Sequence, residues 1–145
     1  MRARTEIEHG GGLAMTVSND PDAGVCEGRS VARRFVSPDG FVVLVGRDAR
    51  ANDLLTFRLA APTDFWLHVA DGSGSHVVVR NPEGLATLPK STVRFAAALA
   101  VRYSGARHAG RVAVHLTRRS DVTKHRRSPD GEVSVLHSRT VYSGD

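Results

Sequence analysis

The sequence predicts an α+β protein with a single domain, in which one main helix packs on a mostly antiparallel sheet of five or six strands. Three observations support this prediction. The chain has 145 residues, a length that suits one compact domain. Short runs of alternating apolar residues recur along it. Only one segment, 91–104, repeats its apolar residues at helical spacing.

The first part of the chain is expected to contain a tail, a hairpin and a short helix. Residues 1–30 are predicted to be a disordered N-terminal tail, because glycines and prolines interrupt every periodic pattern there. Met15 is a candidate for the true start. The domain is then expected over 31–145, opening with a β-hairpin whose turn is Ser37-Pro-Asp-Gly40. A short helix follows, with Asn52 or Asp53 as its expected N-cap.

The second part of the chain supplies another hairpin, the main helix and the last strands. Strands are predicted over 64–69 and 75–80, separated by a five-residue loop. Ser91 is the expected N-cap of the main helix. Two further strands are predicted over 111–117 and 132–137.

The register of the second hairpin predicts a polar face. If the strands pair symmetrically about their loop, Val69 faces Ser75 and His68 faces His76. One face then carries the side chains of Asp64, Trp66, His68, His76, Val78 and Arg80. The later strand adds Arg111 and His115 to a similar face. Trp and His stack on unpaired bases and Arg holds phosphate, so this composition favours nucleic acid.

The charge of the chain is basic and unevenly distributed. It has 20 Lys and Arg against 15 Asp and Glu, a net charge of +5, and only two of the basic residues are lysines. Segment 90–127 has ten basic residues against one acidic residue, a net charge of +9, so the rest carries −4. We expect one strongly positive face or end, as in polyanion-binding proteins. A solvated arginine-rich surface is the alternative.

Composition also bears on compartment. The longest apolar run, 95–101, is far shorter than the roughly 18 to 20 residues of a membrane span, and no secretory signal is visible. Cys26 is the single cysteine, so no internal disulfide forms. We therefore expect a cytoplasmic protein with no membrane partner.

Catalytic and cofactor chemistry find weaker support. The three imidazoles of His68, His76 and His115 would suit zinc, but no His-x-x-x-His or Cys/His cluster in the sequence indicates a metal site. Ser75 and His76 are neighbours on a strand and point to opposite faces, so they do not form a dyad. The glycine-rich segments 46–48 and 71–74 match neither a Walker loop nor a dinucleotide fingerprint. No metal and no cofactor are predicted.

Three ordered motifs resemble the NFACT-R domain. These are the segments Gly46–Thr56, Asp64–His68 and Gly74–Arg80, together with the helix that carries Ala96–Ala100 and is followed by Ser104 and Arg107. NFACT-R is the RNA-binding module of the NFACT proteins, also called fibronectin-binding A proteins, of ribosome-associated quality control. The resemblance covers residues 33–138. A basic stretch and a Pro-x-Gly turn in the family correspond here to Lys124–Arg127 and Ser128–Gly131, which are basic but not identical. None of the other domains of NFACT proteins is present, so the resemblance implies a stand-alone form.

The resemblance implies a non-enzymatic module that binds RNA, either tRNA or ribosomal RNA, with a link to translation or the ribosome. The expected RNA-binding residues are Arg47, Arg50, Asn52, Asp53, Trp66, His68, Ser75, His76, Arg80, Arg94, Arg102, Arg107, Lys124, Arg126 and Arg127. The alternatives are an enzyme acting on RNA, with His68, His76 and Asp71 as acid–base candidates, and an adaptor for an acidic protein. RNA identity, discrimination against DNA and oligomeric state stay open.

Overall fold

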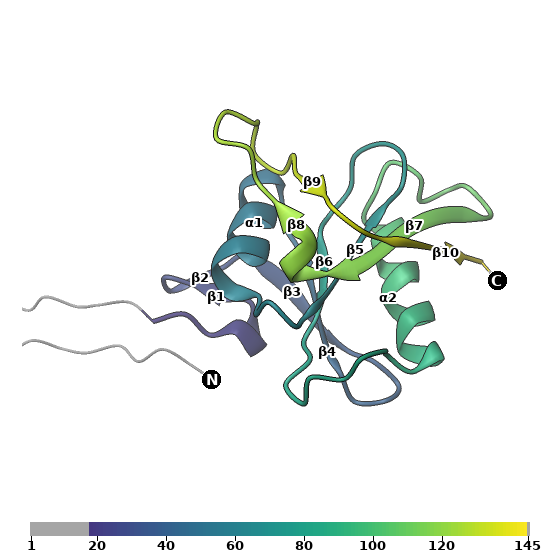
Figure 1. Cartoon of the computed structure of the whole chain (residues 1–145), viewed down its shortest axis with the longest axis horizontal. Helices are drawn as coiled ribbons and strands as arrows, with labels where there is room; N and C mark the ends of the chain where they lie inside the picture. The colour runs from purple at the N-terminus through teal and green to yellow at the C-terminus, as the bar shows by residue number, and fades with distance from the viewer. Residues whose placement is uncertain (1–17, 145) are drawn as a thin grey trace, which may run out of the picture.

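A six-stranded antiparallel sheet organises the chain, in the order β10-β7-β5-β6-β4-β3 (Figure 1). The computed structural model describes residues 18–144, so residues 1–17 of the tail expected over 1–30, and the start considered at Met15, lie outside the described residues. The strands are β3 (Ala32–Val36), β4 (Val42–Gly46), β5 (Phe65–Val69), β6 (Val77–Val79), β7 (Val112–Arg118) and β10 (Arg139–Ser143). The helices are α1 (Ala49–Leu54), which continues into the π-helical turn η2 (Leu55–Leu59), and α2 (Lys90–Arg102). The shorter elements are η1 (Pro21–Ala23), β1 (Val25–Cys26), β2 (Arg29–Ser30), η3 (Arg119–Asp121), β8 (Val122–Thr123) and β9 (Ser134–Val135). The predicted α+β class, with one main helix on an antiparallel sheet, is confirmed.

The β5–β6 hairpin has the register that symmetric pairing predicts. Phe65 pairs with Val79 and Leu67 pairs with Val77. These four side chains lie in the core that α2 covers, whereas Trp66 lies in the core on the other side of the sheet. Alternation along a strand therefore sorts the side chains into two layers, as expected from a period of two.

Each face of the sheet buries a separate apolar cluster. One face packs against α2, whose Ala96 and Ala100 are fully buried. The opposite face packs against α1 through Ala51, against η2 through Leu55 and Leu59, and against the β1–β2 hairpin through Cys26. Figure 1 shows α1 and α2 on opposite sides of the sheet. Among the helices of the described residues, none has the length and apolar composition needed to cross a membrane.

Both predicted helix caps are wrong. The carboxylate of Asp48, not Asn52 or Asp53, caps α1 by accepting a hydrogen bond from the Ala51 amide at 2.8 Å. Asn52 is buried inside that helix. Ser91 likewise lies inside α2. Asp48 directly precedes the helix and accepts from its third amide, which is ordinary N-cap geometry. Asp48, Asn52 and Asp53 all have the side chain of an N-cap, so propensity alone does not identify which of them starts the helix.

Two polar residues of the first turn of α2 bind the β3–β4 turn instead. The Thr92 hydroxyl donates to Asp39 at 2.7 Å, and the Ser91 hydroxyl donates to the same carboxylate. These hydrogen bonds lower the pKa of Asp39. The contact fixes the start of α2 over the turn of the first hairpin.

The two ends of the domain differ from expectation. Residues 18–30, expected to belong to a disordered tail, contain η1, β1 and β2, and Cys26 in this hairpin is buried. The segment 132–137, expected as a strand of the sheet, contributes only β9, which pairs with β8 outside the main sheet. The edge place next to β7 is taken by β10, which was not predicted. Strand β10 is mostly exposed, so its sequence lacks a buried apolar pattern.

An ion-pair network joins the N-terminal segment to the sheet. Asp64 is 1% exposed, and its carboxylate accepts from the Arg80 guanidinium at 2.5 Å, as the predicted register implies. The same carboxylate accepts from the Ala61 and Asn81 amides. Arg80 also binds the exposed Asp22 carboxylate at 3.1 Å. The buried Asp64 carboxylate therefore joins the segment before β5, at Ala61, to the segment after β6, at Arg80 and Asn81.

Replacement of this acid is expected to destabilise the domain strongly. Asp64→Ala removes an acceptor shared by Arg80 and two backbone amides, so the free energy of unfolding should fall by about 3 to 5 kcal/mol. Urea denaturation of the purified protein measures the change. Glu27→Ala is the control, because it breaks the exposed Arg58–Glu27 pair and should cost less than about 1 kcal/mol. Equal losses in the two variants would contradict the assigned role of Asp64.

Candidate functional site

A buried chain of polar side chains ends at His76. The ring of His76 is 1% exposed, with Nδ1 2.8 Å from the Thr56 hydroxyl and Nε2 3.0 Å from the Gly131 carbonyl oxygen. The Trp66 indole N–H donates to the same hydroxyl at 3.2 Å. Since a carbonyl only accepts, His76 Nε2 donates to Gly131 and Thr56 donates to Nδ1. Both ring nitrogens therefore have protein partners.

Backbone hydrogen bonds hold His76 against α1. Its amide donates to the Asn52 side-chain oxygen at 3.0 Å, and its carbonyl accepts from the Gly46 amide at 3.0 Å. A Cβ on Gly46 would lie 1.8 Å from that Asn52 oxygen. The sequence needs glycine at position 46 so that Asn52 can approach β4 and reach β6. This is the physical reason for the Gly46…Asn52 spacing.

His68 lies between the buried chain and solvent. Its ring is stacked on the Trp66 ring, with centroids 5.8 Å apart and an interplanar angle of 11°, and meets His76 edge-on at 5.7 Å. Its Nδ1 donates to the Val69 carbonyl at 2.6 Å. Burial lowers the pKa of His68, and hydrogen bonds to backbone carbonyls oppose this shift in part. The ring is therefore neutral at pH 7.

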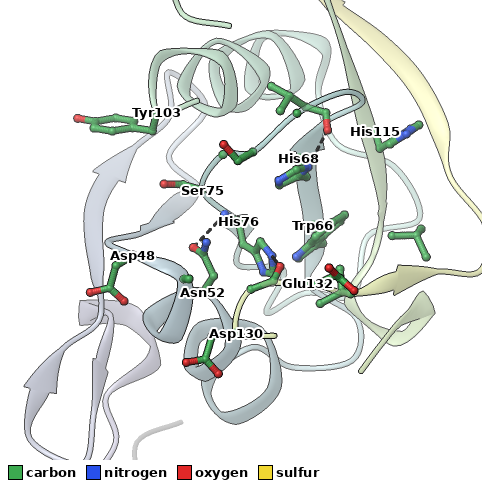
Figure 2. A pocket seen from close by; sticks show the side chains of 18 of the residues that line it. Asp48, Asn52, Trp66, His68, Ser75, His76, Tyr103, His115, Asp130 and Glu132 are labelled. Atoms are coloured by element: carbon green, nitrogen blue, oxygen red, sulfur yellow. Dashed lines mark hydrogen bonds between the residues drawn. The ribbon is translucent and has the colours of Figure 1, made fainter. Parts of the chain in front are cut away.

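These rings line a hollow of about 620 Å³, which we call the imidazole pocket. Its walls include the side chains of Asn52, Trp66, His68, Ser75, His76 and His115 (Figure 2). The exposed carboxylates of Asp48, Asp130 and Glu132 also line it. Within the described part of the chain, no Lys or Arg lines this pocket.

A second hollow of about 470 Å³, which we call the arginine basin, adjoins the first. Four arginines line it, namely Arg33, Arg47, Arg102 and Arg107, and no carboxylate of residues 18–144 does so. Tyr103 stands between two of them, with the Arg33 and Arg102 guanidinium carbons 5.0 and 5.4 Å from its ring centroid. Cation–π contacts of this kind hold the guanidinium groups in place while leaving their N–H groups able to donate.

The two hollows share a wall made by Ser73–Ser75 and Tyr103. Gly74 forms an isolated bridge with Ser104, and a Cβ on Gly74 would lie 2.8 Å from the Ser104 Cβ. The Ser75 amide donates to the Tyr103 carbonyl at 2.9 Å. Figure 2 shows Ser75 between Tyr103 and His76. The close approach that glycine permits therefore brings the β5–β6 loop against the end of α2.

The structure divides the predicted site residues into three groups. Those that line the two hollows are Arg47, Asn52, Trp66, His68, Ser75, His76, Arg102 and Arg107. Exposed arginines outside both hollows are Arg50, Arg94, Arg126 and Arg127. Internal ion pairs hold Arg80, Asp53 and Lys124. The catalytic candidate Asp71 is exposed and lines neither hollow, so the structure does not bring it together with His68 and His76.

Several lining residues escaped sequence reasoning, among them Arg33, Tyr103 and the acidic residues Asp48, Asp130 and Glu132. Arg33 lies on β3, on the side that carries Phe35 toward Tyr103, where the two rings are 6.3 Å apart. Its alternation with Phe35 was available as a signal, but the position of Tyr103 opposite β3 depends on how α2 packs on the sheet.

The expectation for 90–127 was one strongly positive face or end, and its basic residues do not share one face of the sheet. Arg94 and Arg102 are exposed on α2, on one side of the sheet. The Lys124 ammonium lies on the other side, 3.2 Å from the Asp53 carboxylate of α1. The segment passes through the sheet as β7, so its positive charge is divided between two faces.

The geometry bears on the catalytic alternatives. His76 cannot exchange a proton with a ligand unless it breaks a hydrogen bond to Thr56 or Gly131. Among the described residues, no three His, Cys, Asp or Glu side chains are grouped to hold a metal ion. What the site presents is a ring-walled pocket beside a cluster of cations, which is suited to binding.

Comparisons with known proteins identify relatives. The family model described as the NFACT protein RNA binding domain matches residues 32–136. The Rqc2 homolog RqcH of Bacillus subtilis is 36% identical over 112 residues, which are 77% of this chain and 19% of that protein. The NEMF homolog of Drosophila melanogaster, a ribosome quality control complex subunit, is 34% identical over 48% of this chain and 7% of its own length. The solved C-terminal structure of the fibronectin/fibrinogen-binding protein from Streptococcus suis has a TM-score of 0.73 at 30% identity, covering 79% of this chain and 45% of that one. The chain thus spans a small part of its curated relatives.

Loss of the Thr56 hydroxyl is expected to disrupt the buried chain without changing side-chain volume greatly. Thr56→Val leaves the Trp66 N–H and His76 Nδ1 without their shared partner, so the free energy of unfolding should fall by about 2 kcal/mol or more. Urea denaturation measures this. The control is Thr87→Val, at an exposed position in the loop before α2, which should stay within about 0.5 kcal/mol. A Thr56→Val protein as stable as the control would show that the chain contributes nothing.

Stability should fall in mild acid. Burial lowers the pKa of His76 from 6.5 to about 4, so below pH 6.5 the unfolded chain binds a proton that the folded one does not. The resulting loss should reach about 3 kcal/mol near pH 4 and level off below it. Urea denaturation across this pH range tests the loss, and an NMR titration tests the pKa of the His76 ring directly. An imidazole that titrates near its ordinary pKa would contradict the assignment.

Proposed function

The chain belongs to the family of NFACT RNA-binding domains, and from this premise we propose that it binds structured RNA through the arginine basin. The observation that carries the proposal is the arrangement of Arg33, Arg47, Arg102 and Arg107 around one hollow that no carboxylate of the described residues lines. One guanidinium group can donate two parallel hydrogen bonds to a phosphate, so a cluster of guanidinium groups suits the backbone of a polyanion.

The arginines of the basin differ from other arginines of the domain in what their side chains contact. Arg118 donates to the backbone carbonyls of Thr63, Leu85 and Ala86, and Arg119 donates to that of Thr56. Those guanidinium groups are engaged in holding loops. The basin arginines border an open hollow and have fewer internal partners: Arg33 and Arg102 lie against Tyr103, while Arg47 donates to the Ser30 hydroxyl at 3.0 Å and Arg107 to the Ser104 carbonyl at 3.4 Å. Their charge is therefore available to a ligand.

The relatives indicate the setting of this activity. The NEMF homolog of Drosophila melanogaster is named as a subunit of the ribosome quality control complex. We extend that setting to this chain as part of the proposal: its RNA is tRNA or ribosomal RNA, and it acts in the cytoplasm in association with the ribosome. A role limited to binding fits the site better than catalysis, since the protein itself occupies both nitrogens of His76.

Neutralising the basin should weaken RNA binding. For the double variant Arg102→Ala/Arg107→Ala, we expect at least about a tenfold loss of affinity for bulk tRNA, because two phosphate contacts are removed. The slope of log affinity against log salt should become shallower by roughly 1 to 2 units. Fluorescence anisotropy with labelled tRNA, at several salt concentrations, measures both quantities.

A matched control separates local from general charge. Arg139→Ala removes an exposed arginine of β10 that lines neither hollow, and paired with Arg34→Ala it removes two charges, as the test variant does. Equal losses in the two double variants would reject the basin in favour of the overall charge. Binding of an acidic protein that competitor tRNA fails to displace would support the adaptor alternative instead.

A further inference from the structure

The imidazole pocket and the arginine basin have opposite electrostatic character across their shared wall. Four guanidinium groups line the basin, whereas three carboxylates and neutral rings line the pocket. A phosphate is favoured in the basin and repelled from the carboxylate side. Any ligand that occupies both hollows is therefore oriented, with its anionic group in the basin and an uncharged group in the pocket.

The walls of the pocket suit a flat aromatic group. The Trp66 ring covers one side of His68, and the same imidazole lines the pocket. Because burial lowers the pKa of His68, its ring stays neutral and presents a flat, weakly hydrated surface. Nucleobases stack on such rings when they are not stacked in a duplex. The His115 ring, which pairs in register with His68 on the neighbouring strand, extends the wall.

The pocket has room for a single base, and the wall that separates it from the basin is formed by few residues. A volume of about 620 Å³ exceeds what one base needs, and the wall between the hollows consists of a few residues, Ser73–Ser75 and Tyr103. In a nucleotide only the ribose separates the base from its 5′-phosphate. One nucleotide can therefore span the wall, whereas a base pair cannot enter a concave pocket without opening.

The carboxylates at the pocket bear on which base is preferred. Asp48, Asp130 and Glu132 are exposed acceptors at its lining. Adenine, guanine and cytosine each have an exocyclic amino group with two N–H donors for such acceptors, whereas uracil has only its single N3–H. The lining thus favours an amino-bearing base over uracil.

We propose that the two hollows form one site for an unpaired nucleotide of the bound RNA, with its 5′-phosphate in the arginine basin and an amino-bearing base against His68 in the imidazole pocket. This inference rests on the proposed RNA binding and assigns a second element to it. Phosphates supply general affinity, and the pocket selects RNA that can present an unpaired base.

Trp66 makes the proposal directly measurable, because it is the single tryptophan of the chain and stacks on His68. The intact protein is titrated with AMP, GMP, CMP and UMP, and with ribose 5-phosphate as the probe that lacks a base, while Trp66 emission is recorded. We expect AMP, GMP and CMP to change the emission and to bind on the order of tenfold more tightly than ribose 5-phosphate. UMP should bind more weakly than the other three.

Two variants test whether the base lies in the imidazole pocket and the phosphate in the arginine basin. His68→Ala should remove the advantage of AMP over ribose 5-phosphate, while salt-dependent binding of bulk tRNA persists. Arg102→Ala should weaken AMP and ribose 5-phosphate alike. His125→Ala is the matched control, because this histidine is exposed and lines neither hollow. Its circular dichroism and nucleotide binding should equal those of the unaltered protein.

A stem-loop RNA tests the site in its polymeric ligand. Removing one base at a time from the unpaired loop, with the backbone intact, should weaken binding about tenfold at one or a few positions and only in the protein with His68. Binding of tRNA without any effect of base removal or of nucleotides would overturn this inference and leave the proposed RNA binding standing. Failure to bind tRNA at all would overturn both.

Discussion

The site depends on the hydrogen-bond chain that runs from Trp66 through Thr56 to His76 and on to Gly131. Its members come from β5, from η2, from the residue just before β6 and from the loop before β9, so four separate segments meet there. The direction of each bond is fixed, since an indole only donates and a carbonyl only accepts. A buried group left without its partner costs about 1 to 3 kcal/mol. The chain therefore specifies one arrangement of these segments, and that arrangement forms the wall of the imidazole pocket.

This constraint explains why residues that resemble catalytic groups in the sequence instead hold segments of the fold together. The polar groups of these residues bind other parts of the protein. The His76 ring binds the Thr56 hydroxyl, the Asn52 side chain accepts from the His76 amide, and the Ser75 hydroxyl donates to the Gly46 carbonyl. His68 differs, because its ring is only half-buried and lines the pocket. A site that presents a neutral ring beside guanidinium groups recognises ligands by shape and charge. This chemistry fits the proposed binding role better than it fits acid–base catalysis.

The sequence predicted the parts of the fold that follow from local periodicity. The β5–β6 register and the Asp64–Arg80 pair were predictable because a strand alternates its faces and the loop fixes the pairing. The cap of α1 and the strand β10 were not, since Asp48 competes with other polar residues and β10 has no buried apolar face. Arg33 was missed for a different reason. Its role depends on Tyr103, which lies at the end of α2 and meets β3 only through tertiary packing.

Net charge alone describes this protein poorly. A sum of charges along the chain treats all arginines alike. It includes Arg118 and Arg119, which bind backbone carbonyls inside the domain, together with arginines that border solvent. Folding separates the two kinds and divides the basic segment between both faces of the sheet. What remains is an asymmetry at one place, where cations and carboxylates stand on either side of Ser73–Ser75. A uniformly positive surface attracts every polyanion equally. If the chain binds RNA as proposed, selectivity for one form of nucleic acid is expected at this wall, because a ligand that occupies both hollows meets opposite charges on its two sides.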